Sequence, residues 1–300
     1  MIVDANFDGG NIVIVDDANT ANIELHIRKD LNADHSQWFY FRASMIKNTL
    51  CSFFITNAGS VSYPEAWPTC SIVVSTDRKN WYRLATDYEK DILHFSFESN
   101  ADIAYFALFA PYSYEQHQNL IAYALQQPHC QLLACGQSIK HCPIELLQIG
   151  SPAAHKKKIW LIARQHPAET MAEWFIEGFL KGLLNENNEL SKTLLESATF
   201  YVVPNMNPDG SIAGNLRTNA AGVDLNRAWL TPDISTEPEV HFVLEQMKKI
   251  GVDLFLDIHT LDFPPLSFRA KRSIDPESRS CSSILVLKLI VNINHRSSPV

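Results

Sequence analysis

Two histidines and a glutamate are notable in this sequence because of their places beside predicted buried strands. His166 and Glu169 lie three residues apart, after a predicted strand at 159–163 and before a predicted helix. His259 ends a second predicted strand, at 253–258. Sites in open α/β sheets are built outside the carboxyl ends of strands, so the three side chains are expected to meet. Two imidazoles and a carboxylate suit Zn²⁺, and a catalytic zinc takes three protein ligands plus water.

The residues alone leave other interpretations open. A histidine and a glutamate at the spacing of His166 and Glu169 also occur by chance, and for this pair alone a solvated surface turn is the favoured explanation. His259 can be a structural histidine at the end of its strand. Asp257 precedes His259 by two residues, so strand alternation allows both side chains to lie on one face. Its carboxylate could then hydrogen-bond the imidazole of His259 without itself binding the metal. Taken together, the three residues favour a His₂Glu zinc site.

A polar stretch after a predicted strand at 199–203 contains two arginines. Residues 205–210 are turn formers, and loop geometry explains them without a function. Arg217 and Arg227 lie in a polar stretch, and arginines in such stretches are usually surface residues. Near a hydrolytic zinc, however, a guanidinium can stabilise an oxyanion or hold a carboxylate through two parallel hydrogen bonds.

Composition limits the class of protein. The 300 residues are 46% hydrophobic, which allows a sizeable core and, at roughly 150 residues each, about two domains. A net charge of −8 argues against a nucleic-acid partner, which needs a basic surface. Since no apolar run is long enough for a bilayer and the first residues lack signal-peptide character, we expect a cytoplasmic protein without a membrane partner. The sequence does not predict the oligomeric state.

The six cysteines favour reduced thiols, because they show no paired CxxC spacing. A metal site formed by Cys130, Cys135 and Cys142 is the less favoured alternative.

The elements that must position these residues fall into two parts. Residues 1–112 contain short runs of β-branched and aromatic residues separated by polar turns, which is typical of an antiparallel sandwich or barrel. These runs lie at 11–15, 23–27, 38–41, 51–55, 71–75, 81–84, 92–97 and 104–109. Residues 113–300 alternate between predicted helices and strands, which predicts an α/β domain with a parallel or mixed sheet. The helices are predicted at 114–127, 170–184 and 237–250, and a strand or helix at 284–293.

These motifs resemble those of the zinc carboxypeptidases, in their cytosolic carboxypeptidase-like branch. The matching segments of the second part are 164–174 (RQHPAETMAEW), 203–210 (VPNMNPDG), 214–219 (GNLRTN), 224–227 (DLNR) and 257–259 (DIH). Those of the first part are 7–11, 38–41, 63–68 and 111–114. So many matches in the same order make the resemblance specific.

The resemblance implies an N-terminal antiparallel β-sandwich (1–112) followed by a mixed-sheet α/β zinc carboxypeptidase domain (113–300). It also implies a peptide hydrolase that acts at the free C-terminus of a peptide or protein. His166, Glu169 and His259 would hold one zinc ion per chain, which lowers the pKa of a bound water and polarises the scissile carbonyl.

The resemblance also assigns roles to the polar stretch. Arg217 would be catalytic and stabilise the oxyanion of the tetrahedral intermediate. Asn226 and Arg227 would bind the terminal carboxylate of the substrate, which fixes the place of the cut.

The resemblance ends near Asp262. The family continues its third ligand with Gly-Asp-Glu, whereas this chain continues with residues 260–262, Thr-Leu-Asp. Residues 263–300 carry six basic and two acidic residues and match none of the family's last strands, pocket wall or general-base glutamate. The two acidic residues, Asp275 and Glu277, sit in no family context. We interpret the tail as a truncated or frame-shifted ending and predict impaired activity, because a general base contributes about 10²–10⁴-fold.

Two other functions stay open. A zinc amidase that removes acyl groups from amino acids would use a similar ligand set, although the large β-rich part before the site argues against it. A zinc- or peptide-binding remnant would keep the ligands and Arg227 without the base. The preference for a particular C-terminal residue is not predicted, because the pocket residues that would set it lie in the unmatched region. A net charge of −8 gives no global attraction for acidic substrates.

Overall fold

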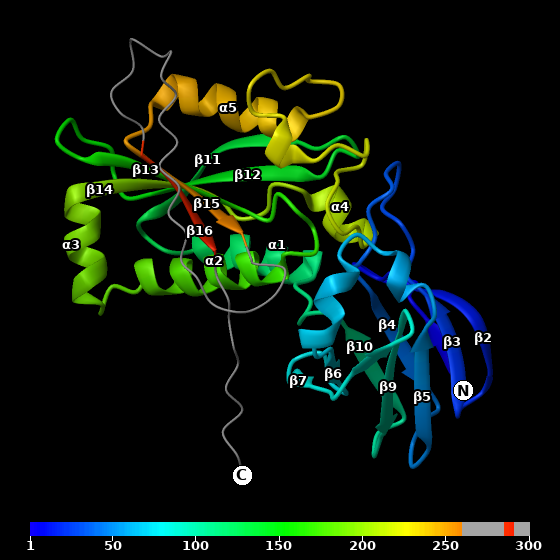
Figure 1. Cartoon of the computed structure of the whole chain (residues 1–300). Coiled ribbons are helices and arrows are strands. Elements are labelled where there is room, and N and C mark those ends of the chain that lie inside the picture. Colours follow the sequence, from blue (N-terminus) through cyan, green and yellow to red (C-terminus); the bar gives the residue numbers. More distant parts are fainter. Residues whose placement is uncertain (260–284, 291–300) are drawn as a thin grey trace.

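The computed structural model describes residues 1–259 and 285–290, with side chains for the first of these ranges. The N-terminal part is a β-sandwich and the second part is an α/β domain that lies against one end of it (Figure 1). The expected fold class is confirmed.

The sandwich is formed by two five-stranded sheets. The first has the order β1 (Ile2–Asp4), β4 (Tyr40–Ser44), β10 (Ile103–Ala107), β6 (Val73–Ser75) and β7 (Tyr82–Arg83). The second has the order β2 (Val13–Asn19), β3 (Asn22–His26), β5 (Leu50–Ile55), β9 (Ile92–Glu98) and β8 (Asp87–Glu89). One pair differs from the antiparallel expectation, because β3 and β5 run parallel. The strand between them in the sequence, β4, lies in the other sheet, so the chain returns to β5 in the direction of β3.

Aromatic side chains fill the space between the two sheets. Phe41 and Phe106 of the first sheet and Phe53 and Phe95 of the second are almost completely buried. The rings of Phe53 and Phe106 lie 4.8 Å apart and those of Phe41 and Phe53 lie 5.4 Å apart. The alternation of buried and more exposed residues along β5 places these rings inward, as a half-buried strand requires.

The α/β domain is built on a six-stranded mixed sheet. Its order is β11 (Cys130–Gln137), β12 (Pro143–Ile149), β14 (Ala198–Val203), β13 (Lys157–Ala163), β15 (Leu254–His259) and β16 (Leu285–Ile290). The last four of these strands are parallel to one another, and β11 and β12 form the antiparallel edge.

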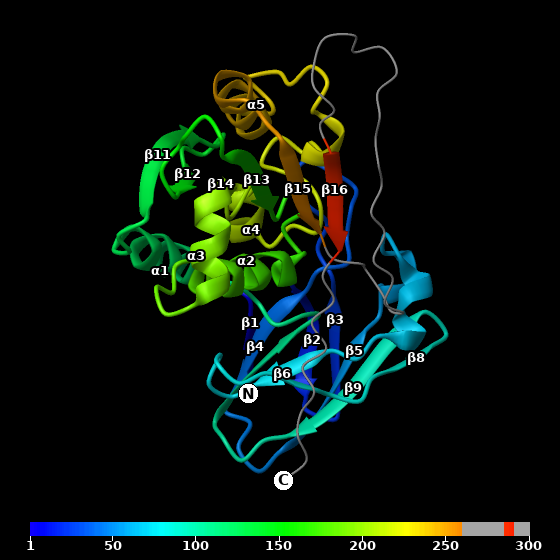
Figure 2. The same ribbon diagram turned by 90° about the vertical axis from the view of Figure 1, so that its left-hand side faces the viewer.

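Helices cover both faces of this sheet, as Figure 2 shows. One face carries α1 (Tyr114–Leu125), α2 (Thr170–Leu183) and α3 (Glu189–Ser197), and the other carries α5 (Pro238–Ile250). A short helix, α4 (Pro208–Ala213), lies at the side of the domain that faces the sandwich. Three short 3₁₀ helices are η1 (Ala58–Ser60), η2 (Pro64–Thr69) and η3 (Leu225–Arg227). Among the described residues, no helix is both long and apolar enough to cross a membrane.

Most predicted elements are confirmed to within a few residues. The apolar run predicted at 284–293 as a strand or a helix contains the strand β16. The sequence did not indicate β1, β8, β11, β12, α3 or α4. For β11 the reason is physical, because this edge strand is largely exposed and does not show a clear alternation.

Candidate metal centre

Parallel pairing of β13 with β15 brings the two histidine-bearing segments together. Ala163, the last residue of β13, lies opposite Ile258 in the register of the pair. Both strands therefore end at the same edge of the sheet. His166 lies three residues after the end of β13, and His259 is the last residue of β15. This is the location expected for a site in an α/β sheet.

The turn that carries His166 and Glu169 is held by a buried arginine. Arg164 has a left-handed backbone conformation, with φ of 57°. Its guanidinium donates hydrogen bonds to the carbonyl oxygens of Pro167 (3.0 Å) and Tyr112 (2.8 Å) and pairs with Glu173 (2.6 Å). These bonds maintain an uncommon conformation that lets the chain leave β13 and enter α2 within a few residues.

The three predicted ligand residues converge. Nδ1 of His166 lies 2.8 Å from Oε1 of Glu169, and Nδ1 of His259 lies 2.8 Å from Oε2 of the same carboxylate. One nitrogen or oxygen from each residue lies within 4.8 Å of the others, and all three residues are buried. In the part of the chain that the structure describes, this is the only group of histidine, cysteine and acidic residues with such geometry. Cys130, Cys135 and Cys142 form no such group within residues 1–259 and 285–290.

Two further carboxylates hold the outer nitrogens of the imidazoles. Nε2 of His166 lies 3.1 Å from Oδ1 of Asp224, and Nε2 of His259 lies 2.8 Å from Oδ2 of Asp257. The amide of Gln165 donates to the same oxygen of Asp257 at 2.9 Å. A carboxylate on the far nitrogen fixes the ring and its tautomer, so that Nδ1 of each histidine faces Glu169.

The carboxylates and imidazoles shift each other's proton affinity. Burial raises the pKa of Glu169, but the charge of His259 and hydrogen bonds from both imidazoles outweigh burial and hold the pKa well below its usual range. Burial lowers the pKa of His259, but the charge of Glu169 and hydrogen bonds to Asp257 and Glu169 raise it to about 9. Burial lowers the pKa of His166, but hydrogen bonds to Asp224 and Glu169 outweigh burial and raise it. Without a metal, therefore, the cluster retains a proton on the His259 imidazole at neutral pH.

The donor set fits a divalent cation. The carboxylates of Glu169, Asp224 and Asp257 gather around the two imidazoles, so a cation bound there would lie among negative groups. Oδ1 of Asp257 is buried and has no hydrogen-bond partner among the described residues. Because two imidazoles and a carboxylate converge within 4.8 Å of one another in the interior, the cluster is suited to a bound divalent cation.

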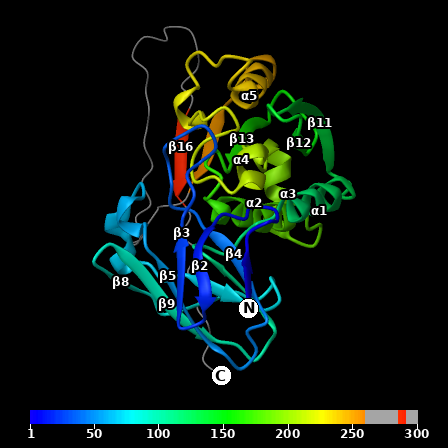
Figure 3. The ribbon, with the colours of Figure 1, turned by 90° about the vertical axis from the view of Figure 1, so that its right-hand side faces the viewer.

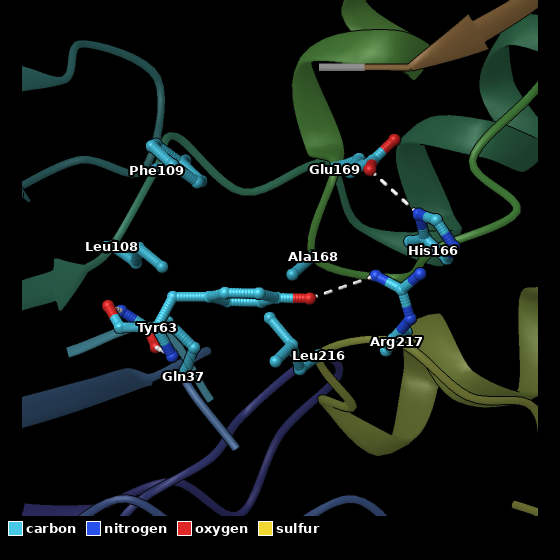
Figure 4. Close-up of a pocket in the computed structure, with 9 residues that line it drawn as sticks. All are labelled: Gln37, Tyr63, Leu108, Phe109, His166, Ala168, Glu169, Leu216 and Arg217. Atoms are coloured by element: carbon cyan, nitrogen blue, oxygen red, sulfur yellow. Dashed lines mark hydrogen bonds and ion pairs between the residues drawn. The ribbon is translucent and has the colours of Figure 1, made fainter. Parts of the chain in front are cut away.

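A pocket opens beside the cluster, and both parts of the chain line it (Figure 4). Arg217 lines it, and its Nε donates to Oδ2 of Asp224 at 2.8 Å. The Tyr63 ring reaches Arg217 from the sandwich, with its hydroxyl oxygen 3.1 Å from Nη1 of the arginine. The other residues that line the pocket are Gln37, Leu108, Phe109, His166, Ala168, Glu169 and Leu216.

The structure places the remaining predicted residues as follows. Asn226 and Arg227 lie in η3, which begins directly after Asp224. The Arg227 side chain is exposed and donates to the carbonyl of Asn226 at 3.1 Å. Asp275 and Glu277 lie outside the described residues, and of the tail interpreted as truncated the structure describes only β16.

Sequence reasoning missed several residues of the site. Asp224 stood in a quoted motif without a role, and its position seven residues after Arg217 did not indicate their ion pair. Tyr63 lies more than 100 residues away from the predicted ligands, in the other domain, so no local spacing could associate it with them. Asp257 was singled out as an outer partner of His259, and the strand places both on one face.

Comparison with known proteins gives matches over both parts of the chain. Residues 3–109 match the family model described as cytosolic carboxypeptidase N-terminal domain, and residues 117–262 match that described as zinc carboxypeptidase. An uncharacterised protein of Zymomonas mobilis is 43% identical over 89% of this chain and 70% of its own length. Human cytosolic carboxypeptidase 6 is 30% identical over 86% of this chain and 57% of its own length, so the chain spans little more than half of that relative.

Solved structures of metallo-carboxypeptidases are also similar to this chain. A metallo-carboxypeptidase from Pseudomonas aeruginosa, in complex with (2-guanidinoethylmercapto)succinic acid, is 43% identical and has a TM-score of 0.87. The match covers 92% of this chain and 75% of that protein. A metallo-carboxypeptidase from Burkholderia cenocepacia is 39% identical, with a TM-score of 0.86 and coverage of 88% and 71%.

We expect His166→Ala to remove zinc from the purified protein, because the two remaining ligands are too few for a catalytic zinc site. Metal analysis after dialysis should give about one zinc per wild-type chain and almost none for the variant. His155→Ala, which changes an exposed histidine outside the cluster, is the matched control and should retain zinc. Equal zinc content in His166→Ala and wild type would contradict the ligand assignment.

Zinc binding should release protons at neutral pH. The metal-free pKa of His259 is about 9, so its imidazole is charged at pH 7 and must lose a proton before its nitrogen can bind a cation. Zinc affinity is therefore expected to rise as pH increases from 6 towards 9. Calorimetric titration in buffers of different ionisation enthalpy measures the protons released, and a heat independent of the buffer would contradict this prediction.

Proposed function

Because this chain belongs to the zinc carboxypeptidases, in their cytosolic branch, we propose that it removes C-terminal residues from peptides or proteins. The observation that carries the proposal is the convergence of His166, Glu169 and His259 from two adjacent strand ends. These residues would hold one zinc ion. When bound, zinc supplies a water of lowered pKa and polarises the scissile carbonyl.

Arg217 is proposed to stabilise negative charge on the carbonyl oxygen of the substrate. Its guanidinium lines the same pocket as His166 and Glu169, and Asp224 and Tyr63 each hold one of its nitrogens. A donor fixed in this way before substrate arrives need not reorganise as charge develops, which is what makes an oxyanion donor effective.

Asn226 and Arg227 are proposed to bind the terminal carboxylate. Both lie in η3, whose first turn is capped by the side chain of Asp224. Because Asp224 also contacts His166 and Arg217, η3 begins at a residue bound to two other parts of the site. An exposed guanidinium at this position could receive a carboxylate through two parallel hydrogen bonds.

The remaining features of the proposal concern the chain as a whole. We propose that residues 1–112 form the N-terminal domain and 113–300 the catalytic domain, and that the protein is cytoplasmic, as the names of its relatives suggest. Glu169, Asp224 and Asp257 are each engaged with an imidazole, and no carboxylate of the tail matches the family's general base. The proposed activity is therefore an impaired one, by a factor of about 10²–10⁴.

Release of a C-terminal residue tests the function. The zinc-loaded chain should release the last amino acid from a peptide with a free carboxylate, and a chelator should stop the release. The same peptide with a C-terminal amide should not be cleaved, because it offers no carboxylate to Arg227. Cleavage of N-acyl amino acids in place of peptides would identify an amidase. Zinc bound at one per chain without any hydrolysis would identify a binding protein, and either result would overturn the proposal.

Arg217→Ala should lower kcat more than it changes KM. Loss of one oxyanion donor costs roughly 10²–10³-fold in turnover, whereas ground-state binding depends on other residues. Steady-state kinetics on the peptide above measures both constants, and Arg83→Ala, an exposed change on β7, is the control. A rise in KM with kcat unchanged would move Arg217 to a substrate-docking role.

A further inference from the structure

We propose that Asp30, in the β-sandwich, is a positioning residue for Arg217. Its carboxylate holds the backbone of residues 216–218, and Tyr63, from the same domain, holds the guanidinium. The N-terminal domain would then complete the site of the neighbouring domain. The kinetic consequence of this inference rests on the proposed role of Arg217, whereas the structural part does not.

The Asp30 carboxylate accepts four hydrogen bonds from the loop that carries Arg217. Oδ1 accepts the backbone N–H of Leu216, and Oδ2 accepts those of Arg217 (2.8 Å) and Thr218 (2.9 Å). The hydroxyl of Thr218 donates to Oδ2 as well, at 3.0 Å. Asp30 is only 5% exposed. Charge-assisted hydrogen bonds of this kind are roughly twice as strong as neutral ones, and three successive amides bound to one carboxylate fix the path of the backbone.

The position of Asp30 argues against a role in the sandwich itself. It lies after β3, outside both sheets, on a segment that rises from the sandwich towards α4 (Figure 3). Neighbouring residues also contact the catalytic-domain loop: Asn215 accepts the N–H of Leu31 at 3.1 Å, and Asn32 donates to the carbonyl of Ala220 at 2.9 Å. The segment therefore serves to connect the two domains.

The loop is built to accept this segment closely. Gly222 has a φ of +83°, and a Cβ placed there would lie 2.2 Å from the carbonyl oxygen of Asn32. Only glycine allows both this conformation and this approach. The contact joins the far end of the loop to the sandwich, while Asp30 holds the three residues around Arg217.

Tyr63 contacts the guanidinium of Arg217, at the opposite end of this residue from the backbone that Asp30 holds. Its ring crosses the pocket, and its hydroxyl lies at Nη1 of Arg217, while Asp224 accepts from Nε (Figure 4). The backbone of Arg217 is thus held by one residue of the sandwich and its guanidinium by another. Since a donor must be placed correctly to stabilise a transition state, both residues should affect turnover more than substrate binding.

Hydrogen exchange tests the structural part without requiring activity. The amides of residues 216–218 should exchange slowly in the intact wild-type chain. In Asp30→Asn, one carboxylate oxygen becomes an NH₂ group facing N–H donors, so exchange at these amides should accelerate at least tenfold while β13 stays protected. Asp34→Asn is the matched control, because Asp34 lies in the same segment but pairs with Lys29 at the surface. It should leave exchange unchanged.

Kinetics tests the functional part. Asp30→Asn should lower kcat about tenfold to a hundredfold with KM nearly constant and zinc content unchanged, within the limit set by loss of an oxyanion donor. In the Arg217→Ala background the same change should cost little, because coupled residues are not additive. Tyr63→Phe should lower kcat several-fold in the same coupled way.

Fast exchange of residues 216–218 in wild type, or unchanged exchange in folded Asp30→Asn, would overturn the proposal. Multiplicative losses of kcat with Arg217→Ala would overturn its functional part. If Asp30→Asn does not fold, exchange in the wild-type chain and the coupling of Tyr63→Phe with Arg217→Ala decide instead. Failure of the peptidase proposal appears separately, as absence of zinc or hydrolysis in wild type.

Discussion

A single buried carboxylate, that of Glu169, joins the two halves of the proposed metal centre. One of its oxygens contacts the imidazole of His166 and the other that of His259, each at 2.8 Å. This arrangement requires that β13 and β15 run in parallel and end together, that Arg164 turn the chain sharply, and that α2 begin immediately afterwards. The rest of the domain forms the framework that maintains this strand pairing, this turn and this helix start together.

Electrostatics explains why such a cluster is tolerated in the interior. Buried carboxylates are stable only when charge partners or hydrogen bonds replace water. Here Asp224 connects one imidazole to Arg217, and Asp257 connects the other to Gln165. In the metal-free protein, the proton that His259 keeps at neutral pH supplies positive charge. A divalent cation would take the place of that proton, so metal and proton compete for the same ring.

The cluster of His166, Glu169 and His259 is predictable from the sequence because each residue lies at a recognisable strand end, and the carboxyl ends of parallel strands meet at one edge of a sheet. His166 and Glu169 lie in one turn, and the alternation of a strand predicts that Asp257 and His259 share a face. The two-part fold follows equally from a change in hydrophobic periodicity near residue 112. Contacts between the two parts of the chain, and the pairing of strands within the sandwich, cannot be predicted in this way. Nothing near Asp30 or Tyr63 indicates that they contact Arg217, and the parallel pairing of β3 with β5 depends on which sheet receives β4.

The connection between the two domains has a consequence for how the protein can be divided. Leu108 and Phe109 line the pocket, and the carbonyl of Tyr112 accepts a hydrogen bond from Arg164, so the segment that links the domains also forms a wall of the site. A linker of this kind is not interchangeable with a flexible one. The α/β domain expressed alone, or grafted behind a foreign partner, would lack part of the lining of the pocket beside the proposed metal centre, so both parts of the chain are needed to build that pocket.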